Sequence, residues 1–420
     1  MAPRQTFVIV GGGLAGASAA QTLRDEGFTG RLRLVGAETE RPYERPPLSK
    51  AYLLGAAERD TIFVHQPSWY HERDVELSLG IRATGLDVAT HELILDTGER
   101  IRYDKVLLAT GSSPHRLTVP GADLNGVHYL REARDADRLR TALMGGGRHV
   151  VIIGGGWIGL EVAAAARGHG NDVTVVESQQ TPLRTALGDE LGGMFADLHR
   201  EHGVDLRLST RVRELIGSGD HVTGVVTDEG VQLPADLAVV GVGVRPSVAI
   251  AEAAGLSVDN GIVVDQAMRS SDPDVYAAGD VANAYHPLLG RHLRVEHWAN
   301  ALHGGPAAAR SMLGLHVSYD EVPYFFTDQY DLGMEYSGHV GVGGYDQIVY
   351  RGNRGNRQFI AFWLDGGRVL AGMNVNVWDV TSDIRDLIRD TGTVDSDRLA
   401  DPDIPLADLV PARTREDSRP

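Results

Sequence analysis

Residues 149–161, His-Val-Val-Ile-Ile-Gly-Gly-Gly-Trp-Ile-Gly-Leu-Glu, decide the fold of this chain. Four apolar residues at 150–153 lead into glycines with the spacing G-x-G-x-x-G at Gly154, Gly156 and Gly159. In this pattern a buried strand turns sharply into a helix: the first glycine closes the turn, the second lets backbone approach a pyrophosphate, and the third lets the helix pack on the strand. The helix N-terminus then points at the phosphates. The stretch therefore predicts a dinucleotide-binding unit.

A near copy of this stretch stands close to the start of the sequence. Residues 7–16 read Phe-Val-Ile-Val-Gly-Gly-Gly-Leu-Ala-Gly. One glycine motif is weak evidence, but two in one chain predict two bound dinucleotides and an α/β fold.

An acidic residue follows the second predicted strand of each unit. Glu38 comes shortly after the strand at 32–35 and is a candidate to accept both ribose hydroxyls of the first nucleotide, the alternative being a solvated loop glutamate. Glu177 ends the strand at 172–176, with the spacing from Gly156 at which an acidic residue meets the ribose 2′-hydroxyl of NAD. No lysine or arginine follows directly to neutralise a 2′-phosphate, so we expect NADH rather than NADPH. The alternative is an unrelated residue at the end of a strand.

Residues 41–50 read Arg-Pro-Tyr-Glu-Arg-Pro-Pro-Leu-Ser-Lys. Three prolines predict a rigid, extended path that would present Arg45 and Lys50 to a ligand. The alternative is a surface loop with ordinary charges. Further along, the run at 75–83 predicts a strand, and the run at 275–281 predicts a strand-to-helix corner that carries the carboxylate of Asp280.

Composition sets further bounds. A chain of 420 residues is long enough for two or three domains. Its formal charge of −17 argues against binding to nucleic acid or to an anionic membrane, and no apolar run reaches the length of a membrane span. There is no cysteine, which excludes disulfides, thiolate nucleophiles and thiolate-held clusters, and the 16 histidines show no metal-site spacing. We expect a cytoplasmic protein without a metal, whose redox chemistry uses an organic cofactor.

Six motifs in order resemble one family, the FAD-dependent ferredoxin reductases of bacterial oxygenase systems. These are glutathione-reductase-like flavoproteins related to apoptosis-inducing factor. The motifs are G-G-G-L-A-G at 11–16, R-P-P-L-S-K at 45–50, A-T-G at 109–111, G-G-G-W-I-G-L-E at 154–161, V-Y-A-A-G-D-V at 275–281 and E-H-W-A-N-A at 296–301. The resemblance covers nearly the full length of the chain.

The resemblance implies an α/β fold with two Rossmann-like domains, the NAD domain being inserted in the FAD domain, followed by a C-terminal α+β domain. The implied boundaries are 1–113 and 243–319 for FAD, 114–242 for NAD, 320–410 for the last domain and 411–420 for a loose tail.

The resemblance also implies which residues bind the cofactors. FAD would occupy the first loop, with Asp280 at the ribityl chain and Trp298 at the ring. The implied FAD-binding positions are Gly11, Gly13, Ala15, Gly16, Ala37, Glu38, Arg45, Lys50, Ala83, Arg131, Asp280 and Trp298. NADH would occupy the second loop, and its implied positions are Gly154, Gly156, Ile158, Gly159, Glu177, Arg184, Gly243 and Glu296.

Lys50 and Glu161 are the pair that the family places together beside the reactive edge of the flavin, which makes them the candidate catalytic residues. A buried lysine is costly without a carboxylate partner, and a cation near a flavin favours the uptake of electrons. The alternative is a salt bridge that only holds domains together.

The sequence departs from the family pattern at three places, of which the last bears on the acceptor. The family often has an aromatic pair ending in tryptophan where this chain has Phe325 and Phe326. Trp157 replaces a commoner phenylalanine or tyrosine, and it would either cover the cofactor or fill the core. The segment after Asn300 lacks the usual glutamine and basic residues on the side where relatives dock their acceptor.

The resemblance implies hydride transfer from NADH to FAD and then single-electron transfer to a ferredoxin-type iron–sulfur protein, by a monomer or a homodimer. Two alternatives are an NADH oxidase or quinone or dye reductase (a diaphorase), and a redox-responsive flavoprotein resembling apoptosis-inducing factor. A docking patch for an acidic ferredoxin would use arginines of a predicted hairpin and of the segment before Glu296, the alternative being a solvated charged turn. These arginines are Arg351, Arg354, Arg357, Arg291 and Arg294.

Overall fold

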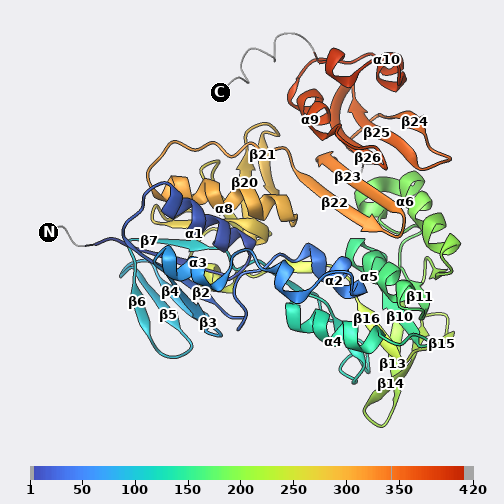
Figure 1. Cartoon of the computed structure of the whole chain (residues 1–420), viewed down its shortest axis with the longest axis horizontal. Helices are drawn as coiled ribbons and strands as arrows, with labels where there is room; N and C mark the ends of the chain where they lie inside the picture. The colour runs from blue at the N-terminus through green and yellow to red at the C-terminus, as the bar shows by residue number, and fades with distance from the viewer. Residues whose placement is uncertain (1–3, 342, 411–420) are drawn as a thin grey trace. The chain divides into compact units, whose positions relative to one another are not determined.

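A computed structural model describes residues 4–341 and 343–410 (Figure 1). The chain forms two compact units. The first comprises Met1–Pro46, Glu58–Ser113 and Val244–Pro323, and the second comprises Pro47–Ala57, Pro114–Gly243 and Tyr324–Pro420.

A five-stranded parallel sheet with the order β19-β7-β1-β2-β3 is the centre of the first unit. Its strands are β1 (Thr6–Val10), β2 (Arg31–Gly36), β3 (Val75–Leu79), β7 (Lys105–Leu108) and β19 (Val275–Ala277). β1 lies between β2 on one side and β7 on the other, so the strand order reverses beside it. In sheets of this type ligands bind at that point, outside the carboxyl ends of the strands. The first glycine loop follows β1 there and leads into α1 (Leu14–Asp25).

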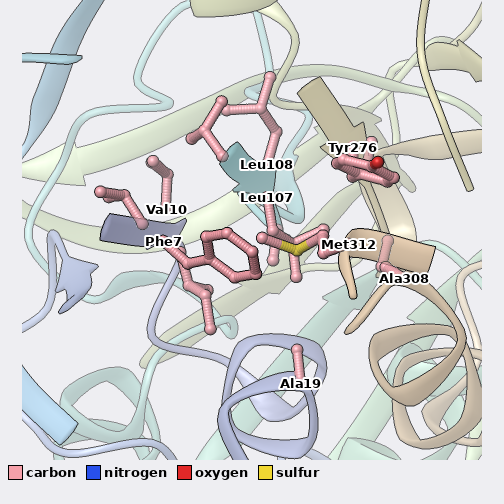
Figure 2. Close-up of a cluster of buried hydrophobic side chains, with 14 of the residues drawn as sticks. Phe7, Val10, Ala19, Leu107, Leu108, Tyr276, Ala308 and Met312 are labelled. Carbon is pink, nitrogen blue, oxygen red and sulfur yellow. The ribbon is translucent and has the colours of Figure 1, made fainter. Parts of the chain in front are cut away.

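Helices α1 and α8 (Trp298–Met312) pack closely together and cover this sheet. Figure 2 shows Phe7 of β1 near Met312 of α8, with Leu107 of β7 between the sheet and the helices. A Cβ on Gly305 of α8 would lie 2.3 Å from the carbonyl oxygen of Ala15 in α1. Glycine at this position therefore permits the close approach of the two helices.

The remaining elements of the first unit flank the parallel sheet. They are the antiparallel strands β4 (Ala83–Asp87), β5 (Glu92–Leu95) and β6 (Arg100–Arg102), the strands β18 (Ile262–Val264), β20 (Ala282–His286) and β21 (Arg291–Arg294), the pair β8 (Ser112–Pro114) and β17 (Val244–Pro246), and the helices α3 (Pro67–Glu72) and α7 (Ala249–Ala253).

The second unit contains another five-stranded parallel sheet, with the order β12-β11-β10-β16-β9. Its strands are β9 (Val127–Tyr129), β10 (His149–Ile153), β11 (Asp172–Val176), β12 (Asp205–Arg207) and β16 (Leu237–Val240). β10 lies between β11 and β16, so the second glycine loop also follows a strand beside which the order reverses. The accompanying helices and small antiparallel sheet are α2 (Ala51–Leu54), α4 (Ala133–Leu143), α5 (Trp157–Gly168), α6 (Arg184–Glu201), β13 (Val212–Ser218), β14 (His221–Thr227) and β15 (Gln232–Pro234).

A five-stranded antiparallel sheet with the order β22-β23-β26-β25-β24 completes the second unit. Its elements are β22 (Tyr324–Gln329), β23 (Leu332–Gly338), β24 (Gln347–Asn353), β25 (Gln358–Asp365), β26 (Arg368–Val375), α9 (Thr381–Arg389) and α10 (Ser396–Ala400). One apolar core joins this sheet to α5 and α6, with Leu160 and Phe195 from the helices packed near Phe359 and Trp363. The two helices are therefore held against this antiparallel sheet.

The predicted fold class is confirmed, and two local predictions are wrong. Residues 46–49 form a 3-10 turn rather than an extended path, because a proline φ near −65° also suits the first turn of a helix. The run at 75–83 is two strands of different sheets, separated at Gly80 with φ +68°. The predicted strand-to-helix corner at 275–281 is present: strand β19 leads into the 3-10 helix Gly279–Val281, which carries Asp280, and strand β20 follows.

The predicted division into three domains stays a prediction. The tail at 411–420, predicted to be loose, lies outside the described residues.

Candidate functional site

Backbone contacts fix the first glycine loop, which joins β1 to α1. Gly11 has φ +131°, and a Cβ there would lie 2.0 Å from the carbonyl oxygen of Ala109. A Cβ on Gly16 would lie 2.2 Å from the carbonyl oxygen of Gly11, so only glycine fits at either position. Around Gly13, in contrast, an added Cβ would meet no atom within 4 Å. Gly13 also caps α1 without a side-chain acceptor for the first N–H groups. This open cradle fits a pyrophosphate.

The second glycine loop, which joins β10 to α5, has the same design. Gly154 has φ +108°, and a Cβ there would lie 2.3 Å from the carbonyl oxygen of Gly241. A Cβ on Gly159 would lie 2.0 Å from the carbonyl oxygen of Gly154. Gly156 again faces open space and caps α5 without a side-chain acceptor. Ile158, in the first turn of α5, is 46% exposed, which is unusual for a large apolar side chain.

Glu38 is part of an ion-pair cluster in the first unit. The Tyr43 hydroxyl donates a hydrogen bond to its carboxylate, and the Arg45 guanidinium lies 2.7 Å from the other carboxylate oxygen. Burial opposes the charge of Arg45, but Tyr43, Glu38 and Asp280 outweigh it and raise the pKa of Arg45. Arg45 is therefore a fixed cation near both predicted carboxylates. Ala37, just before Glu38, is exposed.

Asp280 accepts a hydrogen bond of 2.8 Å from the Ser112 hydroxyl, which the sequence had not indicated. Trp298 begins α8, and its indole influences the Glu44 carboxyl. Burial raises the pKa of Glu44, and the Trp298 contact opposes that shift. Glu296, two residues earlier, pairs with the Arg294 guanidinium.

Glu177 lies directly beside the second glycine loop. Its carboxylate accepts the backbone N–H of Gly155 at 2.5 Å and that of Gln179 at 2.7 Å. The Ser178 hydroxyl donates to the same carboxylate at 3.1 Å. The predicted proximity of this acidic residue to the loop is therefore present, with its orientation fixed by backbone donors.

The other predicted positions are more scattered. Arg184 begins α6 and is paired with Asp189 at 2.7 Å, so its guanidinium is already engaged. Arg131 is half-buried just before α4, and its backbone N–H donates to Asp135. Gly243 has φ +91°, and its carbonyl oxygen accepts the backbone N–H of His115. Ala83 begins β4 in the first unit, and Ala15 is buried in α1.

Lys50 and Glu161 form a close pair within the second unit. Lys50 Nζ lies 2.7 Å from Glu161 Oε1, and the two side chains are 13% and 3% exposed. Ser49 donates to Glu161 Oε2, and Thr327 donates to Glu161 Oε1 at 2.6 Å. Lys50 Nζ also lies 5.2 Å from the centre of the Phe326 ring. Sequence reasoning predicted the pair but missed the two hydroxyl residues.

Two matched contacts hold α5 against β22. Trp157 and Glu161 are four residues apart on one face of α5, and Phe325 and Thr327 are two residues apart on one face of β22. The Trp157 ring lies 4.8 Å from the Phe325 ring and packs edge-on against Phe195. Of the two expectations for Trp157, packing in the core is the one that these contacts support.

The hairpin arginines do not form an unpaired positive patch. Arg351 donates to backbone carbonyls, among them that of Asp401 at 2.6 Å. Arg354 pairs with Glu190 at 2.6 Å, and Arg357 pairs with Glu201 at 2.7 Å. The hairpin itself is present as predicted, and the docking role of its arginines stays a prediction.

Among residues 4–341 and 343–410, no group of three or more histidine, aspartate or glutamate side chains is arranged to hold a metal ion. Within the same residues, no helix is long and apolar enough to cross a membrane.

Comparisons with known proteins agree with the fold and the loops. Residues 5–305 match the family described as pyridine nucleotide-disulphide oxidoreductase, and residues 324–410 match the one described as reductase C-terminal. The chain is 37% identical to putidaredoxin reductase of Pseudomonas putida, over 99% of both chains. It is 39% identical to the ferredoxin–NAD(+) reductase component of the anthranilate 1,2-dioxygenase system of Burkholderia cepacia, over 95% of this chain and 98% of the other. The crystal structure of a covalent putidaredoxin reductase–putidaredoxin complex matches with a TM-score of 0.92 and 36% identity, over 98% of this chain and 99% of that one.

The fold and the two loops define a two-dinucleotide oxidoreductase. The chain belongs to the pyridine nucleotide-disulphide oxidoreductase family, in the branch that carries the reductase C-terminal domain. The predicted enzyme class and the cofactors FAD and NAD(H) are thereby confirmed. Because the sequence has no cysteine, the disulfide chemistry in the family's description is not available to this chain.

Proposed function

We propose that this protein takes a hydride from NADH and passes single electrons to a ferredoxin-type iron–sulfur protein of an oxygenase or a similar electron-transfer chain. The observation that carries the proposal is the pair of glycine loops, each open at its second glycine, in a chain without cysteine. The relatives named as ferredoxin and putidaredoxin reductases support it over a diaphorase or a redox sensor. A flavin supplies the chemistry that converts one hydride into single-electron transfers.

In this proposal FAD binds at the first loop, within residues 1–113 and 243–319. The backbone N–H groups at the start of α1 hold its pyrophosphate beside Gly13, and Glu38 holds its adenosine ribose. Arg45 neutralises phosphate charge, because it is a fixed cation with a raised pKa. Trp298 and Asp280 orient the ring and the ribityl chain.

NADH binds at the second loop, within residues 114–242. Gly156 lets the pyrophosphate approach the start of α5, and Glu177 accepts the ribose hydroxyls. Both carboxylate oxygens of Glu177 already accept backbone N–H groups, so the acidic side chain is pre-oriented and would repel a 2′-phosphate. Ile158, exposed in the first turn of α5, would cover the nucleotide.

Lys50 would supply a positive charge that stabilises a reduced flavin, and Glu161 holds Lys50 in place. A buried ammonium needs a carboxylate partner, and the 2.7 Å pair supplies it. Residues 320–410 form the C-terminal α+β domain, from which Phe326 packs near Lys50. We place the protein in the cytoplasm.

The chemical role of Lys50 is tested by Lys50→Ala. Because an ammonium stabilises developing negative charge, we expect flavin reduction by NADH to slow at least about tenfold in stopped-flow experiments. The conservative control is Lys50→Arg, which keeps the charge. A normal rate of reduction in Lys50→Ala would remove the redox role and leave a structural ion pair.

Stopped-flow reduction with NADH and NADPH, followed by turnover with ferredoxins from one genome, tests the proposed function. We expect rapid reduction by NADH and rapid cytochrome c reduction only when a ferredoxin is added. Equal dye or quinone reduction without ferredoxin would favour a diaphorase. Slow reduction by NADH with long retention of the electrons would favour a redox-responsive protein.

A further inference from the structure

A buried chain of hydrogen bonds runs from Glu161 away from Lys50. Thr327 Oγ1 lies 2.6 Å from Glu161 Oε1, and Gln329 Nε2 lies 3.1 Å from Thr327 Oγ1. His199 Nε2 lies 2.8 Å from Gln329 Oε1, and the Tyr330 hydroxyl lies 3.3 Å from His199 Nδ1. The four side chains from Glu161 to His199 are each 3% exposed or less. They come from α5, β22 and α6, all within the second unit.

The number of hydrogens fixes the direction of every bond in this chain. The Thr327 hydroxyl has one hydrogen, and an ionised Glu161 can only accept, so that hydrogen points to Glu161. Gln329 must then present its NH₂ group to Thr327, because its carbonyl oxygen would leave two acceptors facing each other.

The positions of the hydrogens are fixed in the same way at the far end of the hydrogen-bond chain. With its NH₂ group toward Thr327, Gln329 presents its oxygen to His199, which must carry a hydrogen on Nε2. His199 Nδ1 is then an acceptor for the Tyr330 hydroxyl. All four donors therefore point toward Glu161.

The surroundings of His199 agree with a neutral ring. Burial lowers the pKa of His199 to about 4, the hydrogen bond with Gln329 opposes this, and nearby His202 lowers it further. His202 stacks on Tyr330 at 3.8 Å and faces Asp331 at 3.8 Å, so the charged groups at this end lie beyond Tyr330. Burial also raises the pKa of the Tyr330 hydroxyl, which keeps it a donor.

We infer that Thr327, Gln329 and His199 are positioning residues that hold Glu161 ionised and turned toward Lys50 through a one-way chain of donors. Donor chains of this kind polarise each bond toward the acceptor, and a buried carboxylate gains most from them. The reverse polarity requires a neutral Glu161 that donates to Thr327, a Gln329 amide turned over, and a hydrogen on His199 Nδ1. The tautomer of His199 therefore reports the charge of Glu161 at the other end of the chain.

The first test reads the His199 tautomer by ¹⁵N NMR of the FAD-loaded full chain labelled at histidine, with the signal assigned by loss in His199→Gln. We expect the neutral form with hydrogen on Nε2 at pH 7. Hydrogen on Nδ1 would overturn the inference. This readout needs no turnover, so its outcome is independent of the proposed function. Only the use of the Lys50–Glu161 pair in flavin reduction rests on the proposed function.

The second test cuts the chain at Thr327. Thr327→Val keeps the shape of the side chain but removes the hydroxyl, whereas Thr327→Ser keeps the hydroxyl. We expect both His199 tautomers in the valine variant and one in the serine variant. At saturating NADH, flavin reduction should slow about tenfold in Thr327→Val and recover in Thr327→Ser. A single Nε2–H tautomer or an unchanged rate of flavin reduction in Thr327→Val would overturn the positioning role. If that variant does not fold, the tautomer of His199 in the wild type still decides the direction of the hydrogen bonds.

Discussion

Removing the Lys50 ammonium should destabilise the second unit because it leaves Glu161 buried without its counter-charge. Loss of one partner from a buried ion pair costs about 3–5 kcal/mol. Glu161 is only 3% exposed, but it keeps the hydroxyl donors Ser49 and Thr327. We therefore expect a cost near the lower end, about 3 kcal/mol, for Lys50→Met, which preserves most of the apolar stem.

A double-mutant cycle separates the interaction energy of Lys50 and Glu161 from the contributions of their other contacts. Glu161→Gln removes the negative charge but can still accept from Lys50 and Thr327. In the combined variant neither charge is buried alone, so its cost should be smaller than the sum of the single costs by about 2 kcal/mol. The measurement is equilibrium urea unfolding of the FAD-loaded protein, followed by tryptophan fluorescence at one fixed FAD concentration.

An exposed ion pair in the same unit provides the control. Arg200 and Asp197 on α6 lie 3.2 Å apart, with side chains 50% and 66% exposed. Solvent screening should reduce their coupling energy to about 0.5 kcal/mol or less. If the Lys50–Glu161 cycle gives a coupling energy as small as this control, the buried pair is not an energetic unit and the reasoning fails.

Three further predictions concern the loops, nucleotide choice and pH. Gly13→Ala should fold but retain FAD less tightly, because its Cβ would enter the open space proposed for the pyrophosphate. Gly11→Ala should fail to fold, because its Cβ would lie 2.0 Å from a carbonyl oxygen. Gel filtration and the FAD content of the purified protein distinguish the two variants. Glu177→Gln should lower the ratio of kcat/KM for NADH to that for NADPH by about tenfold, and an unchanged ratio in steady-state assays would contradict a ribose contact. Burial lowers the pKa of His199 in the folded protein to about 4, from its usual 6.5. The unfolded chain therefore binds the proton more readily, so the contribution of His199 to stability is complete above pH 6.5 and is lost as the pH falls toward 4. The difference between the two pKa values corresponds to about 3 kcal/mol in the free energy of unfolding. Urea unfolding between pH 6.5 and pH 4 should show this loss in the wild type and not in His199→Gln.

The sequence predicted those parts of the site that depend on local geometry. A turn from strand to helix requires glycine at Gly11 and Gly154 because their φ angles are positive and carbonyl oxygens lie close by. Such requirements leave a pattern of fixed spacing that can be read without a structure. The acidic residue Glu177 could be predicted for the same reason, since it follows a strand of fixed length.

Contacts between distant parts of the chain left no such pattern. Thr327 reaches Glu161 from 166 residues away, and His199 reaches Gln329 from 130 residues away. A threonine or glutamine in a strand has no spacing that distinguishes a buried donor from a solvated side chain. The turn at residues 46–49 was missed for a different reason: the φ angle of proline suits both an extended segment and a 3-10 helix.

Helix α5 links the second glycine loop to the Lys50–Glu161 pair. Glu161 follows Trp157 by four residues, which is about 6 Å along the helix axis. Trp157 packs on Phe325 while Glu161 bonds Thr327, so both anchor α5 to the same strand, β22. The two contacts hold both ends of this helical turn on the same strand, and the packing on Phe325 gives Trp157 a structural reason to be large and aromatic.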